Sequence, residues 1–215
     1  MKDRLAVLNE IESKGVVAVV RADSSEQLGG VVGALYDGGT TCIEITMTTP
    51  NALEAIADAA KKYGDRCAIG VGTVLDAETA RAAILAGAEF VVAPILDLPT
   101  VELCKRYSKV VVPGAFTPTE IVRAWQAGAD VVKVFPATKL GPSFFKDMKG
   151  PLPHIKLTPT GGVSLENAGE FIKAGAVALG VGSAMVDKKA VASGDFKTLT
   201  NKAAAFIKAV ADARA

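Results

Sequence analysis

The chain has 215 residues, of which 50% are hydrophobic, which is enough for a sizeable core and too many for a disordered protein. Lysine and arginine total 24 against 23 aspartate and glutamate, so the charge balance gives no reason to expect a nucleic acid or a membrane surface as a partner. No apolar run is long enough for a signal peptide or a membrane span, and the three cysteines lack the spacing of a disulfide framework or a zinc site, which together predict a soluble protein of the reducing cytoplasm.

Residues 1–14 predict a helix with Leu5, Leu8 and Ile11 on one side. After it, short runs rich in valine and isoleucine alternate with longer segments of helical period. We count eight such runs: Gly15–Arg21, Cys42–Met47, Cys67–Val74, Phe90–Pro94, Val110–Ala115, Val131–Pro136, Ile155–Thr160 and Val177–Ser183. Continuous apolar runs indicate strands that are buried on both faces, as in a parallel sheet covered by helices. Eight such units in a chain of this length predict an α/β fold, a single (β/α)8 barrel domain over residues 1–215 with an N-terminal helix.

Helix start and stop signals between the runs agree with this arrangement. Start signals follow the third, fifth and seventh runs, at Asp76, Thr117 and Ser164. Stop signals precede other runs, because glycine accepts the left-handed conformation that ends a helix. These glycines are Gly39, Gly87, Gly128 and Gly175.

Two charged residues lie inside the apolar runs and a third closes one of them. Glu44 lies in the second run, Lys133 in the sixth, and Arg21 ends the first. Burying an unpaired charge costs several kcal/mol, so these residues need a reason. Strand alternation predicts that Glu44 and Lys133 both point into the barrel. A buried salt bridge that fills the lumen is one interpretation, and it is less attractive because Arg21 adds a second cation near the same mouth.

The other interpretation is covalent catalysis. A lysine in an apolar barrel, close to a second cation, should have a lowered pKa, and its free amine could then attack a ketone. The resulting Schiff base on Lys133 would withdraw electrons from the adjacent carbon–carbon bond, with Glu44 moving the protons. This chemistry predicts an aldolase that forms a Schiff base with a ketone substrate. Two alternatives remain open: a phosphosugar isomerase or epimerase that uses Glu44 as its base, and a phosphate-binding barrel without activity.

The ends of the last two runs predict a phosphate site. The seventh ends in Thr160, Gly161 and Gly162, and the eighth in Gly182 and Ser183. In barrels, the loops after these two strands often bind phosphate through backbone N–H groups. With a single histidine, which precedes the seventh run, and no carboxylate cluster at the run ends, we expect neither a metal site nor a cofactor.

Several short motifs match one family in order and spacing: Glu44-Ile-Thr, Gly70-Val-Gly-Thr73-Val, Ala93-Pro94, Pro113-Gly114, Lys133-Val-Phe135-Pro136, Pro159-Thr160-Gly161-Gly162 and Gly182-Ser183. From about Val16 to Met185 the chain resembles the 2-keto-3-deoxy-6-phosphogluconate aldolases, also called KDPG/KHG aldolases. The resemblance implies a metal-independent class I aldolase of the Entner–Doudoroff pathway. It would be a homotrimer that cleaves 2-keto-3-deoxy-6-phosphogluconate to pyruvate and glyceraldehyde 3-phosphate.

Site roles follow from the same resemblance. Lys133 resembles the Schiff-base lysine and Glu44 the general acid/base, Thr73 the contact to the pyruvate carboxylate, and Pro94 and Phe135 the apolar wall. The sugar- and phosphate-binding positions would be Thr160, Gly161, Gly162, Gly182 and Ser183.

The chain departs from part of the family at one position. Some members carry an arginine where this chain has Thr48, and we assign the role of holding the carboxylate to Arg21 instead. The galacto epimer and 4-hydroxy-2-oxoglutarate remain alternative substrates. The hydroxyl of Thr160 favours the gluco substrate, because family members devoted to the galacto epimer tend to have an apolar residue there.

Overall fold

The computed structural model describes residues 2–21 and 25–215, without the side chains of residues 25 and 26. Its strands are β1 (Val16–Val20), β2 (Cys42–Thr46), β3 (Ala68–Gly72), β4 (Phe90–Val92), β5 (Val110–Val112), β6 (Gly114–Ala115), β7 (Val132–Val134), β8 (Leu157–Pro159) and β9 (Leu179–Val181). Its helices are α1 (Arg4–Lys14), α2 (Ser25–Asp37), α3 (Ala52–Tyr63), α4 (Ala77–Ala86), α5 (Leu98–Arg106), α6 (Pro118–Gln126), a short 3₁₀ helix (Ala137–Lys139), α7 (Gly141–Lys149), α8 (Leu165–Lys173), α9 (Lys188–Ser193) and α10 (Phe196–Arg214).

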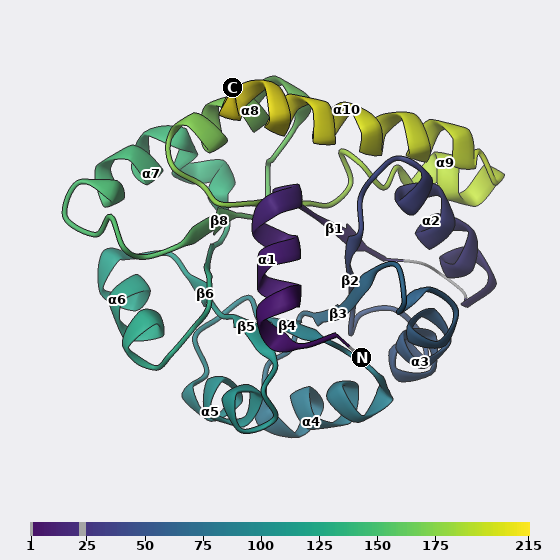
Figure 1. Ribbon diagram of the computed structural model, residues 1–215, viewed down its shortest axis with the longest axis horizontal. Coiled ribbons are helices and arrows are strands. Elements are labelled where there is room, and N and C mark those ends of the chain that lie inside the picture. The colour runs from purple at the N-terminus through teal and green to yellow at the C-terminus, as the bar shows by residue number, and fades with distance from the viewer. Residues whose placement is uncertain (1, 22–24) are drawn as a thin grey trace.

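All strand pairs are parallel, in the order β5-β4-β3-β2-β1-β9 and β6-β7-β8. Bridges between Leu157 and Ala176 and between Thr160 and Gly180 join β8 to the chain at β9. The helices surround the strands as a ring (Figure 1). The fold is therefore the predicted α/β barrel of the TIM type with an N-terminal helix.

The fifth predicted strand is interrupted at its centre. Pro113 has no N–H to donate to a neighbouring strand. The N–H of Gly114 turns instead to the carbonyl of Ile95 (3.1 Å), while the Pro113 carbonyl still accepts from Lys133 (2.9 Å). The fifth run thus becomes β5 and β6, and Lys133 lies on β7.

Two layers of apolar side chains form the core. Ile43, Ile45, Val132 and Val134 belong to the outer layer, between the strands and the helices. Cys42 and Val131, which directly precede Ile43 and Val132 in the sequence, belong to the inner layer that fills the lumen. Because side chains alternate along a strand, Glu44 and Lys133 face the lumen, as predicted.

Helix α1 closes the amino-terminal end of the barrel (Figure 1). Its Val7 and Ile11 are buried and join the inner layer, whereas Leu5 is 60% exposed. Of the residues expected on one side of this helix, Ile11 is therefore buried and Leu5 is not. The helix closes the end of a barrel instead of packing along a sheet, so its buried stripe is narrow.

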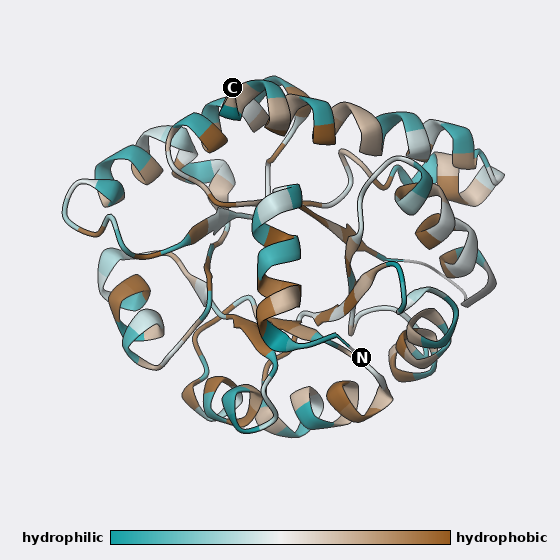
Figure 2. Ribbon diagram, in the orientation of Figure 1, coloured by the Kyte–Doolittle hydropathy of each residue, from teal (hydrophilic) through white to brown (hydrophobic). Residues whose placement is uncertain are grey.

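The predicted helix boundaries are largely confirmed. The carboxylate of Asp76 accepts from the backbone of Thr79 (2.6 Å), and Thr117 and Glu120 form a capping box before α6. The glycines at positions 39, 87, 128 and 175 all have positive φ. Hydrophobic and hydrophilic residues alternate along the outer helices (Figure 2). Among the described residues, no helix combines the length and the hydropathy needed to cross a membrane.

Candidate active site

Every predicted site residue lies in or just after the carboxyl-terminal part of a strand. Arg21 follows β1, Glu44 is in β2, Thr73 follows β3, Pro94 follows β4, and Lys133 and Phe135 are in and after β7; Thr160, Gly161 and Gly162 follow β8, and Gly182 and Ser183 follow β9. In barrels of this type, the carboxyl-terminal ends of the strands form the mouth where active sites lie. The predicted site residues therefore lie together at one end of the molecule, opposite α1.

Glu44 and Lys133 are both buried in the lumen, with 3% and 5% of their surfaces exposed. On its two sides, Lys133 pairs in register with Gly114 and Thr158. Within the described part of the chain, no ion pair with nitrogen and oxygen inside 4.0 Å involves either Glu44 or Lys133. The two groups nonetheless affect each other electrostatically.

Burial dominates the electrostatics of this pair. It lowers the pKa of Lys133, which the Glu44 carboxylate partly restores and the Arg21 guanidinium lowers further. Burial also raises the pKa of Glu44, against the opposing effect of Lys133 and Arg21. A lysine with a lowered pKa presents its neutral amine more readily, and a carboxyl group with a raised pKa holds and returns a proton more readily. This arrangement can therefore support nucleophilic attack together with proton transfer.

An aromatic ring lies beside the amine. The Lys133 Nζ lies 4.9 Å from the centroid of the Phe135 ring. A Cβ placed on Gly161 would lie 3.5 Å from the same ring, so the loop after β8 packs against it. Pro94 closes the neighbouring side, where its backbone lies against Gly114. Phe135 thus puts an apolar ring beside the amine, with the β8 loop against that ring and Pro94 against the Gly114 that pairs with Lys133.

Two predicted contacts to a carboxylate lie on opposite sides of β2. Arg21 is exposed at the end of β1, and its charge acts on both Glu44 and Lys133. Thr73 ends β3 in a left-handed conformation with φ of 61°, which is costly for a residue other than glycine. Strain of this kind is common where a backbone is held for binding. Between them, the Thr46 and Thr48 hydroxyls lie 2.8 Å apart.

The loops after β8 and β9 expose backbone donors. Gly161 and Gly162 have φ of 86° and 75° and precede helix α8. In the part of the chain that the structure describes, none of the N–H groups of Gly161, Gly162, Gly182 and Ser183 donates a backbone hydrogen bond. A Cβ on Gly182 would meet nothing within 4 Å, so the space beside this glycine is open. These features fit the predicted phosphate site.

A small cavity of about 20 Å³ lies inside the lumen, and Glu44, Thr158 and Thr160 contribute to its lining. Thr158, which faces the lumen beside Lys133, donates a hydrogen bond to the Ala178 carbonyl (2.8 Å). The sequence prediction did not include Thr158. Its position two residues before Thr160 on the same strand could have indicated it, because residues i and i+2 share a face.

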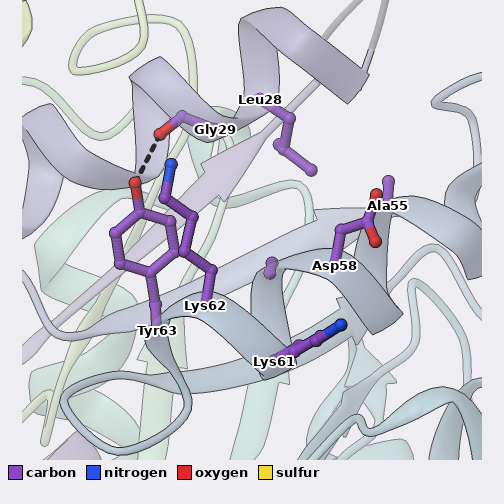
Figure 3. A pocket seen from close by; sticks show the side chains of 8 residues that line it. Leu28, Gly29, Ala55, Asp58, Lys61, Lys62 and Tyr63 are labelled. Carbon is purple, nitrogen blue, oxygen red and sulfur yellow. Dashed lines mark hydrogen bonds between the residues drawn. The ribbon is translucent and has the colours of Figure 1, made fainter.

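Other features of the structure lie away from the mouth. A surface hollow of about 580 Å³ between α2 and α3 contains none of the predicted residues (Figure 3). The Tyr63 hydroxyl there donates to the Gly29 carbonyl (2.9 Å). His154 is exposed and lies edge-on to the Trp125 ring, at 4.7 Å between centroids. Among the described residues, no group of three or more histidine, cysteine, aspartate or glutamate side chains could hold a metal ion.

Comparison with known proteins identifies the family. A 2-dehydro-3-deoxy-phosphogluconate aldolase of Treponema pallidum is 36% identical over 91% of this chain and 93% of its own. A 2-dehydro-3-deoxy-6-phosphogalactonate aldolase of Escherichia coli K12 is 33% identical over 92% and 95%. The crystal structure of a KDPG aldolase from Legionella pneumophila, with pyruvate captured as a covalent carbinolamine, superposes with a TM-score of 0.87 at 25% identity and covers 93% of this chain and 97% of that one. The sequence model of the KDPG and KHG aldolases matches residues 7–202, so the chain belongs to this family of aldolases, which are lyases.

Proposed function

We propose that the protein is a class I aldolase that cleaves 2-keto-3-deoxy-6-phosphogluconate to pyruvate and D-glyceraldehyde 3-phosphate, and also splits 4-hydroxy-2-oxoglutarate to pyruvate and glyoxylate. The observation that carries the proposal is the pair of Lys133 and Glu44, both buried in the lumen, with burial lowering the pKa of the amine. The captured carbinolamine in the Legionella relative supports a covalent route. Because the electron sink would be the Schiff base on Lys133, the reaction needs no separate cofactor.

The proposed steps use the two buried groups in turn. The amine of Lys133 attacks the ketone carbon of the substrate and water leaves, which gives an iminium ion. Glu44 takes the proton of the C4 hydroxyl as the bond between C3 and C4 breaks; the aldehyde departs and the electron pair passes into an enamine. A proton returned to C3 and hydrolysis of the iminium then release pyruvate and the free lysine.

The substrate is tested by a coupled assay of pyruvate release from three keto acids in parallel: 2-keto-3-deoxy-6-phosphogluconate, its galacto epimer and 4-hydroxy-2-oxoglutarate. We expect the gluco substrate to have the highest kcat/KM. The support is the Thr160 hydroxyl, which lies against Gly180 at the lumen wall and can donate to a substrate hydroxyl. The second candidate is the galacto epimer, favoured by the similarity to the E. coli phosphogalactonate enzyme, and a higher kcat/KM for it would replace our assignment.

The isomerase or epimerase alternative predicts a different result with pyruvate and borohydride. Only an enzyme that forms a Schiff base is trapped as a reduced adduct, since electrostatic use of Lys133 leaves no covalent bond to reduce. Absence of an adduct together with interconversion of phosphosugars would favour this alternative.

Arg21→Ala is expected to depress kcat/KM for the phosphorylated and the unphosphorylated keto acids by similar factors. Every candidate substrate contains the pyruvate carboxylate, and loss of a charged hydrogen-bond partner costs about 2–5 kcal/mol. The measurement is kcat/KM on 2-keto-3-deoxy-6-phosphogluconate and on 4-hydroxy-2-oxoglutarate. If only the phosphorylated substrate suffers, Arg21 is a phosphate ligand, and the carboxylate must depend on Thr73 and backbone amides.

Ser183→Ala is the matched control for this test. Ser183 is exposed after β9, next to N–H groups that we assign to the phosphate. Its loss should raise KM for the phosphorylated substrate and leave 4-hydroxy-2-oxoglutarate unchanged. Opposite patterns for the two variants would separate the carboxylate end of the site from the phosphate end.

We further propose that the enzyme is a homotrimer of one-domain chains in the cytoplasm. Leu75, Ile95, Leu98 and Phe116 are exposed in the segments after the neighbouring strands β3, β4 and β6. Exposed apolar side chains that lie together often mark a protein–protein interface, and we assign these four to the subunit contact. Analytical ultracentrifugation should give three times the chain mass of 22.1 kDa, and a mass of one or two chains would contradict the proposal.

The three cysteines are buried free thiols, in keeping with a reducing compartment.

A further inference from the structure

The carboxylate of Glu44 occupies the space where a side chain at position 72 would lie. Gly72 ends β3, which pairs with β2 so that Thr46 lies opposite Gly72 and Glu44 opposite Gly70. A Cβ built on Gly72 would lie 1.7 Å from Glu44 Oε1, 2.4 Å from Cδ and 2.7 Å from Cγ. The backbone of Gly72 is not in the left-handed region, so its conformation alone would accept any residue. What requires glycine at this position is the carboxylate itself.

We propose that Gly72 is a positioning residue for the reaction, because its missing side chain fixes where the Glu44 carboxylate can lie. This inference rests on the proposed role of Glu44 in proton transfer. An alanine would force Oε1 to move by about 1 Å or more, since contacts below 3.0 Å do not persist. The cavity of about 20 Å³ beside Glu44 has room for roughly one water and cannot take the whole carboxyl group. The carboxylate would therefore leave its place against Gly72.

The same strand offers a matched control. Gly70 precedes Gly72 by two residues and faces the same side, but the three atoms nearest to a Cβ there all belong to the Phe90 ring, the closest at 2.4 Å. Phe90 is fully buried in the inner apolar layer. Gly70→Ala thus overpacks the same lumen, with its closest overlap on the Phe90 ring instead of on the carboxylate.

The experiment measures kcat and the yield of the pyruvate–borohydride adduct for the wild type, Gly72→Ala, Gly70→Ala, Glu44→Gln and the double variant Gly72→Ala/Glu44→Gln. We expect Gly72→Ala to lower kcat by about 10²-fold, because a 1 Å displacement of a catalytic group can cost that much. Its adduct yield should stay close to that of the wild type, since Lys133 is not displaced. Gly70→Ala should lower kcat less than Gly72→Ala at a comparable loss of melting temperature.

The double variant distinguishes positioning from a general structural effect. If Gly72 acts through Glu44, adding Gly72→Ala to Glu44→Gln should change kcat by no more than about threefold, whereas independent effects multiply. Wild-type kcat in Gly72→Ala, or full multiplication in the double variant, would overturn the proposal.

Two further outcomes keep the inference separate from the proposed function. If Glu44→Gln itself retains wild-type kcat, the role of Glu44 fails, and a crystal structure of Gly72→Ala then decides the inference by showing whether the carboxylate has moved. If Gly72→Ala does not fold, Gly72→Ala/Glu44→Ala should fold, because removal of the carboxylate vacates the space. Failure of that variant as well would show that the overlap is not with Glu44, and the proposal would be wrong.

Discussion

Replacing Lys133 with alanine is expected to lower pyruvate release from all three keto acids by on the order of 10⁴-fold or more. The amine is the only proposed covalent group, and among the described residues Lys133 is the one lysine that lies within a strand and faces the lumen. The coupled assay measures the loss. Lys173→Ala is a suitable control, because Lys173 is an exposed lysine on helix α8.

Two companion measurements identify the reaction that is lost. Pyruvate and borohydride should label the wild type at Lys133, located by peptide mass spectrometry, and should not label Lys133→Ala. Lys133→Arg should be inactive, since a guanidinium stays protonated and cannot act as a nucleophilic amine. Activity in the arginine variant, or labelling of another lysine, would leave Lys133 with only an electrostatic role.

The pH dependence of adduct formation follows from the lowered pKa of Lys133. An amine attacks only in its neutral form, so the rate should rise with pH through this pKa and level off above it. Because burial and Arg21 lower the pKa from the ordinary 10.5, the half-maximal rate should be reached below that pH. A rate that still rises through pH 10.5 would mean that the amine behaves as an ordinary exposed lysine.

The sequence predicted the strands well because their signal is local. Each buried parallel strand is a short continuous apolar run, and glycine or capping residues mark the ends of most of the neighbouring helices. The one strand that differs is the fifth, which is interrupted at Pro113. Proline is a local signal, but the interruption also depends on which carbonyl accepts the N–H of the next residue. Gly114 bonds to the Ile95 carbonyl, on the chain after β4, and the sequence could not show this contact.

The placement of the site was predictable for a similar reason. The alternation of side chains along a strand predicts that Glu44 and Lys133 point into the lumen. Parallel strands bring all their carboxyl-terminal ends to one mouth of the barrel. Close contacts between side-chain positions on adjacent strands were not predictable. The overlap between position 72 and the Glu44 carboxylate depends on the register of β2 with β3 and on one rotamer, and neither leaves a mark in the sequence.

The burial of Glu44 has two explanations: a structural salt bridge with Lys133, or a carboxyl group kept for proton transfer. They predict opposite effects of Glu44→Gln on stability. A structural salt bridge would make Glu44→Gln destabilising, because Lys133 would lose its partner. The structure gives the pKa of Glu44 as raised, with burial as the largest cause. A carboxyl group with a raised pKa in the folded state favours folding below its ordinary pKa of 4.5, and this contribution is lost as the pH rises through the raised value. The melting temperature of Glu44→Gln relative to the wild type should therefore increase as the pH rises above 4.5.

The rate of the same variant is expected to fall by about 10²–10⁴-fold, the usual contribution of a positioned acid or base. Glutamine keeps the size and the hydrogen-bonding capacity of the side chain but cannot accept the C4 hydroxyl proton. The pyruvate adduct should still form with borohydride, because attack by Lys133 does not need the carboxylate as a partner. Loss of turnover with adduct formation and stability preserved would assign Glu44 to the chemistry. Wild-type turnover would mean that another group moves the protons, and an unfolded variant would mean that the barrel needs the buried charge pair for its structure.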